Sequence, residues 1–267
     1  MASCKAENHS TMDFMVMTLL LFSAFLMHGV QAGRGVGLLP DRSLLEANYY
    51  SWSPGHATYY GGPDASGTNG GACGYQNALA LGYGEHTAAI SDMLYDKGLA
   101  CGACFEVKCV GSKCRSNTVV VTATNESPQY TTAHPGPHFD LSQPAFDVIA
   151  PEILGSIIIQ YKRVTCHKKG GIKFQIQGSK YWMSVLVYNV GGAGDVRSLS
   201  VKGSNTSWKA LQHQWGQNWA STSVLEGLDG YEISFSTTTS DGKTLHSYNV
   251  GGKWWKYGHT YEGSQYY

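Results

Sequence analysis

The chain has 267 residues, enough for one large domain or two of ordinary size. Its 19 basic and 19 acidic side chains balance, so no surplus of positive charge points to a nucleic-acid partner. Glycine (33) and tyrosine (17) are abundant, and helix-favouring runs are few. This composition is typical of β-structure with many turns.

The N-terminus predicts a signal peptide. An apolar run at 14–27 follows Asp13 and is too short to span a bilayer comfortably, although a membrane anchor is the alternative interpretation. Val30-Gln-Ala32 has the arrangement of a cleavage site, so we expect residues 1–32 to be removed. Because no second apolar span follows, the mature protein is expected to be secreted, without a transmembrane anchor.

The cysteines indicate disulfides rather than a metal site. Loss of Cys4 with the signal peptide leaves six: Cys73, Cys101, Cys104, Cys109, Cys114 and Cys166. An even number in a secreted chain suggests three disulfides, for which 15 pairings exist. Cys101-Gly-Ala-Cys104 could also be a redox or zinc motif, but no second C-x-x-C or His pair at ligand spacing accompanies it. We therefore expect no metal and no cofactor.

The first half of the chain predicts strands with short helices. Residues 33–55 form an N-terminal extension, and order is expected to begin with the β-like run 56–60. The glycine-rich segment 61–71 either lets the backbone approach a ligand closely or simply forms a long turn. The apolar residues of 87–95 fall at helical spacing, and 142–149 predicts a second short helix. Strands are expected at 104–109, 118–124 and 157–164.

The best domain boundary is His167-Lys-Lys-Gly-Gly171, after which no cysteine occurs. Beyond it, strand candidates recur at short spacing, separated by turns that contain Gly, Asn or Asp. They lie at 172–176, 181–188, 196–201, 232–238 and 244–250, with room for two or three more. Five clear strands in about a hundred residues favour a β-sandwich.

The segment His134–Pro144 carries the most conspicuous candidates for chemistry. Three prolines stiffen it around His138, Phe139 and Asp140, because each fixes its own φ and restricts the residue before it. A carboxylate and an imidazole held in this way are well placed to act on a substrate. The alternative is a proline-rich surface turn with an acidic tip.

Tryptophan is concentrated in the second half, which holds six of the seven. Strand alternation in 181–188 puts Met183, Val185 and Val187 on one face and leaves Trp182 on the other. Further aromatics cluster at Trp208, at 215–219 and at 254–257. Exposed flat rings can stack on pyranose sugars, whereas the alternative is that any single tryptophan belongs to the core.

Motifs along nearly the whole mature chain resemble those of the expansins, the plant cell-wall loosening proteins, and most of all the α-expansin branch. In the first half they are Ala57-Thr-Tyr-Tyr-Gly-Gly62, Asp64-Ala-Ser-Gly-Thr68, Gly70-Gly-Ala-Cys-Gly-Tyr75, Cys101-Gly-Ala-Cys-Phe-Glu106, Val121-Thr-Ala-Thr-Asn125 and His138-Phe-Asp-Leu-Ser-Gln-Pro144. In the second half they are Asn189-Val-Gly-Gly-Ala-Gly-Asp-Val196, Trp215-Gly-Gln-Asn-Trp219 and Thr238-Thr-Ser-Asp-Gly242.

The resemblance implies an all-β chain of two domains. The first, at 56–168, would be a six-stranded double-psi β-barrel with short helices, similar to glycoside hydrolase family 45. The second, at 169–267, would be an immunoglobulin-like β-sandwich that serves as a carbohydrate-binding module. The implied groove residues are Thr58, Tyr59, Tyr60, Asp64, Asn125, His138 and Asp140, and the implied sugar-stacking residues are Trp182 and Trp215. The implied disulfides are Cys73–Cys101, Cys104–Cys166 and Cys109–Cys114.

Two features depart from the α-expansin pattern. The chain has Asn125-Glu-Ser-Pro-Gln-Tyr130 where α-expansins usually have Asn-Phe-Cys-Pro-Pro-Asn, and it lacks a further cysteine of a Trp-Cys pair. The remaining six cysteines fit the simpler disulfide set of β-expansins. Two N-glycosylation sequons occur, at Asn125 and Asn205, and Asn205 is the favoured one because proline directly follows the first.

The groove residues argue against hydrolysis. An inverting glycosidase needs two carboxyl groups roughly 6.5–9.5 Å apart. Asp140 resembles the family-45 general acid, but Asn125 stands where related proteins have an acid, and an amide is not a useful base. Asp64 and Glu126 are candidate substitutes, although Glu126 alternates away from Asn125 if the strand continues.

We therefore expect a secreted, monomeric, non-hydrolytic wall protein, favoured at acidic pH. Its partners would be cellulose and xyloglucan or a related glucan. The alternatives are a family-45-like endoglucanase and a wall-binding or signalling protein that does not loosen walls.

Overall fold

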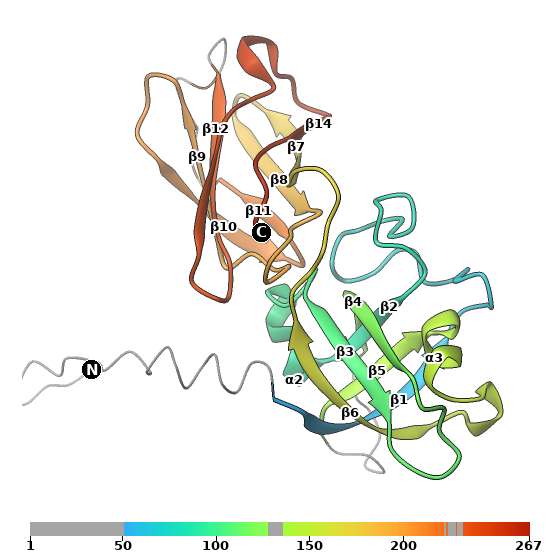
Figure 1. Ribbon diagram of the computed structural model, residues 1–267. Helices are drawn as coiled ribbons and strands as arrows, with labels where there is room; N and C mark the ends of the chain where they lie inside the picture. The colour runs from blue at the N-terminus through green and yellow to red at the C-terminus, as the bar shows by residue number, and fades with distance from the viewer. Residues whose placement is uncertain (1–50, 128–135, 222, 224–227, 229–231) are drawn as a thin grey trace, which may run out of the picture. The chain divides into compact units, whose positions relative to one another are not determined.

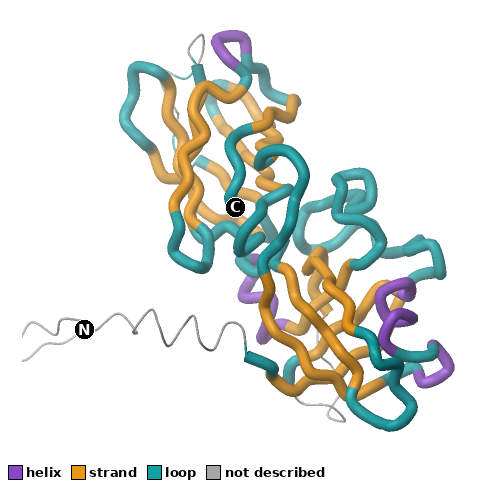
Figure 2. Tube along the Cα trace, viewed as in Figure 1, coloured by secondary structure: helices purple, strands orange, loops and turns teal. Residues whose placement is uncertain are grey.

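The structure is a computed structural model that describes residues 51–127, 136–221, 223, 228 and 232–267 (Figure 1). The expected signal peptide at 1–32, and the extension up to residue 50, lie outside the described residues. Strands dominate and the helices are short (Figure 2). Within the described part of the chain, no helix has the length and hydrophobicity needed to cross a membrane.

The first half forms a closed barrel of six strands in the order β1-β5-β2-β4-β3-β6. The β1–β5 and β2–β4 pairs are parallel, and the other pairs are antiparallel. The strands are β1 Ser53–Tyr60, β2 Thr87–Ser91, β3 Cys104–Cys109, β4 Thr118–Ser127, β5 His138–Ser142 and β6 Ile157–Val164. The short helices are α2 Asp92–Tyr95, α3 Gln143–Ile149, η1 Asp96–Gly98 and η2 Glu152–Leu154. This barrel confirms the expected architecture.

Alternation along the strands gives the barrel its core. On β5, Phe139 and Leu141 are fully buried, whereas His138 and Asp140 are only partly buried. The ring of Phe139 lies 5.2 Å from that of Phe105 on β3, in an edge-to-face arrangement that aromatic pairs prefer. The core therefore fixes which residues of β5 face away from it.

The predicted helix at 87–95 is wrong over most of its length. Residues Thr87–Ser91 form β2, and only Asp92–Tyr95 is helical. All five residues of β2 are buried, because the strand lies between β4 and β5 in the barrel. A strand covered on both sides has no polar alternation, so its apolar residues can imitate helical spacing. The helix predicted at 142–149 is confirmed as α3.

The second half forms an eight-stranded sheet in the order β13-β12-β9-β10-β11-β8-β7-β14. It folds into two layers that share β10, with β7 and β8 in one layer and β9, β12 and β13 in the other. Phe174 of β7 stacks on Phe235 of β12 at 4.3 Å between ring centroids, which places the core between the layers.

The sandwich contains the five predicted strands and three more. The five are β7 Lys173–Ser179, β8 Trp182–Tyr188, β9 Ser198–Gly203, β12 Ile233–Thr238 and β13 Thr244–Val250. The additional strands are β10 Lys209–Trp215, β11 Asn218–Ala220 and β14 His259–Glu262, and a short turn, η3, spans Gly252–Trp254. The predicted sandwich is confirmed.

The six described cysteines form three disulfides, all joining barrel segments or their immediate C-terminal extension. The pairs are Cys73–Cys101, Cys104–Cys166 and Cys109–Cys114, the pairing that the expansin resemblance implies. Cys166 also forms an isolated β-bridge with Gly192. Cys166, which lies between β6 and β7, is therefore held by a disulfide and by backbone hydrogen bonds.

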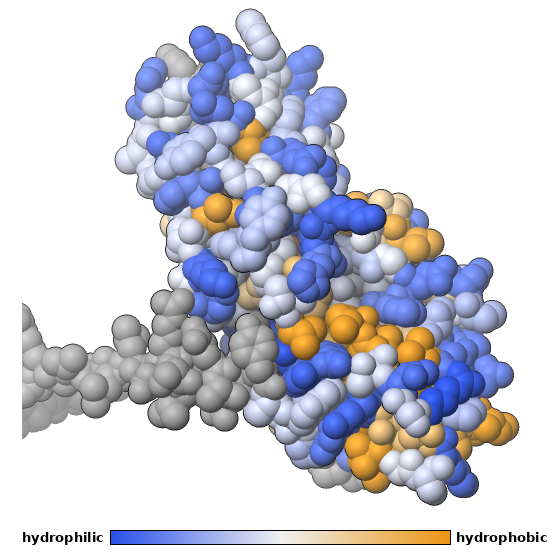
Figure 3. All heavy atoms as spheres, viewed as in Figure 1, coloured by the Kyte–Doolittle hydropathy of each residue, from blue (hydrophilic) through white to orange (hydrophobic). Residues whose placement is uncertain are grey.

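Exposed apolar side chains differ in kind between the two halves. On the barrel they are aliphatic, and apolar patches are visible over it in Figure 3. Among the described residues of the second half, the large exposed ones are all aromatic: Tyr181, Trp182, Trp215, Tyr248, Trp254 and Tyr267. Aromatic rings are the side chains suited to stacking on sugars, so this half is where a glycan surface is expected.

Candidate functional site

Strand register assembles a row of side chains across four neighbouring strands of the barrel. Thr58 on β1 pairs with Asp140 on β5, and Asp140 pairs with Ala89 on β2. Ala89 in turn pairs with Asn125 on β4, because an irregularity after Ala88 shifts the register by one residue. Directly paired residues point to the same side of a sheet. The row Thr58–Asp140–Ala89–Asn125 is therefore continuous.

The separation of Asp140 and Asn125 follows from the same register. One strand lies between them, and neighbouring strands are about 4.8 Å apart, so their Cα atoms are about 10 Å apart. The carboxyl groups of inverting glycosidases lie roughly 6.5–9.5 Å apart. Only the methyl group of Ala89 stands between the two positions. Asp140 and Asn125 thus lie on the same side of the barrel with one strand between them.

Asp140 is held by a short chain of hydrogen bonds. The Thr58 hydroxyl donates to Asp140 Oδ1 at 2.6 Å, and Thr58 Oγ1 lies 3.1 Å from Nε2 of His138. Since the single hydroxyl proton goes to Asp140, the bond between His138 and Thr58 needs a proton on Nε2. Burial raises the pKa of Asp140, while the Thr58 hydrogen bond and the nearby His138 oppose the rise. This carboxyl is therefore biased toward its protonated form.

Tyr60 adds a neutral hydroxyl beside the row. It pairs with Ser142 at the end of the β1–β5 ladder, two residues beyond Thr58 and on the same side of β1. Burial and the negative charge of Asp140 raise the pKa of Tyr60 to about 12. Tyr60 is therefore a neutral hydroxyl, and not a phenolate, at neutral and acidic pH.

Asn125 also has a structural task. Its Oδ1 accepts hydrogen bonds from the backbone N–H of Ala72 and of Glu126, both at 2.8 Å. A Cβ at Gly71 would lie 2.7 Å from Cγ of Asn125, so the loop can approach this closely only with glycine there. The amide thus fastens the glycine-rich loop to β4.

Neither candidate substitute for a base joins the row. Glu126 pairs with Ile90 rather than with Ala89, and burial and the charge of Asp92 raise the pKa of Glu126. Asp64 is exposed and accepts a hydrogen bond from the backbone of Ser66 at 2.9 Å. That bond and the Ser66 side chain lower the pKa of Asp64. Its hydrogen bonds hold its own loop together.

Tyr59 lies away from the row. Alternation along β1 directs its side chain opposite to Thr58 and Tyr60, and its ring packs 4.9 Å from that of Phe146 in α3. Among the expected groove residues, the structure thus gathers Thr58, Tyr60, Asn125, His138 and Asp140, while Tyr59 packs beneath them.

The two expected stacking residues share one outer face of the sandwich. Trp182 on β8 is 52% exposed, and Trp215 on β10 is 53% exposed. Trp215 pairs with Asn218, which pairs with Leu186, four residues beyond Trp182 and thus on the same side of β8. The rows of the two rings lie about 13 Å apart along the strand direction.

Polar side chains that sequence reasoning missed lie beside Trp215. A depression of about 420 Å³ is lined by Gln175, Gln177, Leu186, Trp215, Asn218 and the loop residues Gly70, Gly71, Gly74 and Gln76. The outward glutamines on β7 alternate with the buried Phe174 and Ile176, a pattern that could have revealed them. Asn125, a member of the Asp140 row, accepts a hydrogen bond from Ala72 in the same loop. The loop therefore contacts both the Asp140 row and the depression beside Trp215.

Comparison with known proteins identifies the family. The family model for the expansin C-terminal domain matches residues 172–251, and one described as lytic transglycolase, of the double-psi barrel type, matches 87–161. Expansin-A25 of Oryza sativa subsp. japonica is 42% identical over 230 residues, covering 81% of this chain and 89% of the relative. Expansin-A22 of Arabidopsis thaliana is 39% identical over 254 residues, covering 88% and 89%.

Solved structures share the fold. The expansin of Clavibacter michiganensis matches with a TM-score of 0.65 at 20% identity, covering 81% of this chain and 98% of that one. A variant of the bacterial protein crystallised with cellohexaose matches with a TM-score of 0.63. The described architecture is thus a double-psi β-barrel followed by a β-sandwich. The chain belongs to the expansin family, and its plant relatives are A-type expansins.

Proposed function

We propose that this expansin is a secreted protein that loosens cell walls without hydrolysing them. It binds cellulose and a matrix glucan such as xyloglucan, works as a monomer and is favoured at acidic pH. The observation that carries the proposal is the row Thr58–Asp140–Ala89–Asn125, in which the acid has its place but an amide stands where a base would act. An amide does not accept a proton from water at neutral pH.

The two halves have separate tasks in this mechanism. The face that carries Trp182 and Trp215 holds the protein on cellulose by stacking against sugar rings. The Asp140 row holds a second glucan chain by hydrogen bonds. A protonated Asp140 donates to a sugar hydroxyl, and Tyr60 offers another donor. These bonds replace those between neighbouring chains, so one chain separates from the other without any covalent change.

The substitution Asp140→Ala is expected to reduce wall extension by about tenfold or more, because it removes the carboxyl donor to the glucan and leaves no polar group in its place. Extension of heat-killed walls at acid pH and release of reducing ends are measured on the same preparation. We expect the wild type to extend walls without releasing reducing ends, and the variant to bind cellulose with the wild-type affinity. Normal extension by the variant would contradict the groove assignment.

The same paired measurement separates the two alternatives. Soluble reducing ends from the wild type would establish an endoglucanase and overturn the proposal. Binding without extension by the wild type would instead establish a wall-binding or signalling protein.

Thr58 is expected to set the pH range of loosening. Its hydrogen bond lowers the pKa of Asp140, so Thr58→Val raises that pKa further. If the protonated carboxyl is the working form, activity is present below the pKa and is lost as pH rises through it. The extension profile of Thr58→Val should therefore continue to higher pH than wild type. Thr58→Ser keeps the hydroxyl and should leave the profile unchanged, and an unshifted Thr58→Val profile would assign the titration to another group.

Changing Trp182 or Trp215 to Ala is expected to weaken cellulose binding and to leave the barrel unchanged. Loss of one stacking ring costs about 0.5–1.5 kcal/mol, or roughly two- to tenfold in affinity. Binding isotherms on crystalline cellulose measure the loss. Tyr248→Ala is the matched control, because Tyr248 is 59% exposed but lies on β13, in the other layer. Equal losses for all three variants would argue against a specific face.

A further inference from the structure

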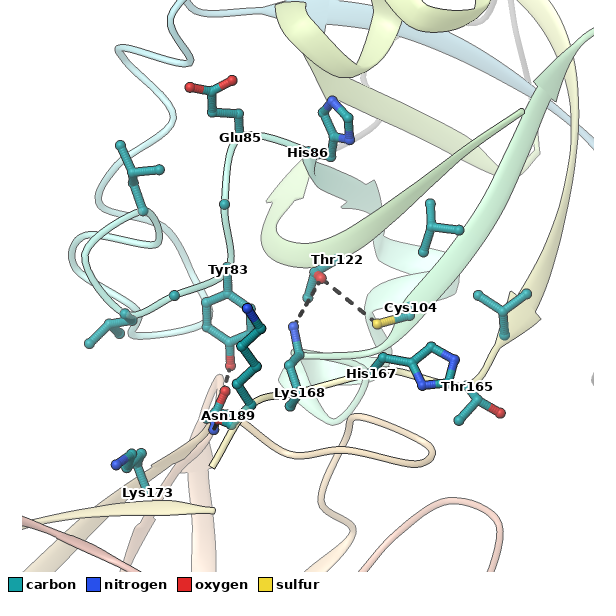
Figure 4. Close-up of a pocket in the computed structure, with 17 residues that line it drawn as sticks. Tyr83, Glu85, His86, Cys104, Thr122, Thr165, His167, Lys168, Lys173 and Asn189 are labelled. Atoms are coloured by element: carbon teal, nitrogen blue, oxygen red, sulfur yellow. Dashed lines mark hydrogen bonds between the residues drawn. The ribbon is translucent and has the colours of Figure 1, made fainter. Parts of the chain in front are cut away.

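A large cavity in the described part of the chain shares no residue with the Asp140 row. It has a volume of about 1100 Å³ (Figure 4). Its lining comes from the loop before β2, from β3, β4, β6 and β7, from the segment between β6 and β7, and from the residue that follows β8: Leu79, Leu81, Gly82, Tyr83, Gly84, Glu85, His86, Cys104, Val120, Thr122, Val164, Thr165, His167, Lys168, Lys169, Lys173 and Asn189. Neutral-glucan binding by the groove leaves this pocket without a role.

Lys168 reaches into the pocket without a counter-ion. Its Nζ donates a long hydrogen bond, 3.4 Å, to Thr122 Oγ1 and lies 4.4 Å from the centre of the Tyr83 ring (Figure 4). No carboxylate of the described residues lies within ion-pair distance of it. Lys173, in contrast, is paired with Glu262 at 2.6 Å. Burial lowers the pKa of Lys168 to about 8.

The other charged groups of the pocket do not neutralise Lys168. Lys169, His86 and His167 are exposed at the rim and can only add positive charge. Glu85 supplies the one carboxylate among the lining residues that the structure describes, and Figure 4 shows it directed away from Lys168. A partly buried ammonium without a counter-ion favours an anionic ligand, since a charge-assisted hydrogen bond would then satisfy it.

The walls indicate what else the ligand carries. Leu79, Leu81, Val120 and Val164 give the pocket aliphatic surface, and Leu79 and Val120 are 51% and 49% exposed. Aliphatic walls with a few polar groups suit a ring that has apolar C–H faces and a single charged substituent. The volume also exceeds what a small inorganic ion needs.

We propose that this pocket binds a carboxylate-bearing sugar, a uronate unit of an acidic polysaccharide, with Lys168 as the counter-ion of the carboxylate. The chain then holds an acidic polymer at a place separate from the surface that takes neutral glucan. The mature protein could thus engage two chemically different polymers at once.

Calorimetric titration of the mature protein with a galacturonate oligosaccharide tests the proposal, with cellohexaose as the neutral probe. We expect Lys168→Met to weaken binding of the acidic oligosaccharide by about tenfold or more, because a hydrogen bond between charged groups is lost. Lys113→Met removes the same charge from an exposed loop and should change the affinity by less than about twofold. Circular dichroism and unchanged cellohexaose binding show that Lys168→Met is folded.

The pH dependence provides a readout that a merely structural role would not give. Affinity should fall as pH rises through about 8, where Lys168 loses its proton. The other titratable groups around the pocket are Lys169, the Lys173–Glu262 pair, His86, His167, Glu85 and Tyr83. Lys168→Met should lack this fall in affinity.

Three results would overturn the proposal. One is displacement of the acidic oligosaccharide by cellohexaose, another is an unchanged affinity in Lys168→Met, and the third is displacement by acetate as effective as by monomeric galacturonate. The last result would show that the pocket recognises a carboxylate group and not a sugar that carries one. Binding of the monomer as tight as that of the oligomer would support a site for a single uronate unit.

Discussion

Replacing Asn125 with Asp is expected to give this expansin a measurable endoglucanase activity. The register already sets residue 125 about 10 Å from Asp140 between Cα atoms, across the small side chain of Ala89. A carboxylate there could activate a water while Asp140, whose pKa is raised by burial, serves as the acid. General-base catalysis contributes typically about 10²–10⁴-fold, so the release of reducing ends should rise by this order above the wild-type background.

The substitution should leave the fold intact. An aspartate oxygen can accept the same two backbone N–H groups, from Ala72 and Glu126, that the amide oxygen accepts. Because Asn125→Asp also removes a sequon, Ser127→Ala is the matched control: it removes the sequon without adding a carboxylate. The double variant Asn125→Asp, Asp140→Asn should be inactive. If Asn125→Asp releases no reducing ends, the missing base is not the only reason why the groove does not hydrolyse glucan.

Asp195→Asn is expected to destabilise the protein by about 3–5 kcal/mol, the cost typical of removing one partner from a buried ion pair. Asp195 is fully buried and accepts hydrogen bonds from Arg163 Nη2 at 3.1 Å and from the Ser240 hydroxyl at 2.8 Å. The side chain of Arg163 is only 12% exposed, so its charge would remain largely out of water without that carboxylate. Denaturant titration of the mature chain measures the loss.

Asp96→Asn is the matched control for this experiment. Asp96 pairs with Arg197, which also approaches Asp195, but its side chain is 50% exposed. An exposed ion pair contributes at most about 1 kcal/mol. Asp96 has a positive φ of 51°, a conformation that asparagine tolerates, so the substitution adds no backbone strain. Similar losses of unfolding free energy for both variants would show that burial does not increase the contribution of the Asp195 ion pair to stability.

Most strands were predictable from sequence, and the misses have physical causes. Regular β-branched or alternating runs such as Ile157–Val164 appear in the structure with the predicted bounds. The strand Thr87–Ser91 was predicted as helix, because a strand buried on both sides loses the polar alternation that identifies it. The segment His138–Ser142 lies in a proline-stiffened stretch for which no strand is predicted, yet it is a strand paired with both β1 and β2. Pairing between distant segments leaves no local signal.

The candidate site was predictable in its residues but not in its geometry. The motifs named Thr58, Asn125 and Asp140, but only the register shows that one strand separates the last two. The register shift after Ala88 puts Asn125 in the row, and this shift cannot be predicted from any sequence pattern. The Lys168 pocket escaped prediction altogether, since its lining comes from segments between 79 and 189 that meet only in the fold.

The double hydrogen bond to Asn125 Oδ1 bears on how such proteins diversify. The two backbone N–H groups need an oxygen acceptor at this position, and either asparagine or aspartate supplies one. The codons of these amino acids differ by a single nucleotide. A lineage can therefore exchange the amide for the acid, in either direction, while the loop and barrel stay folded. Selection on what happens to the polysaccharide, rather than on folding, then decides which side chain is kept.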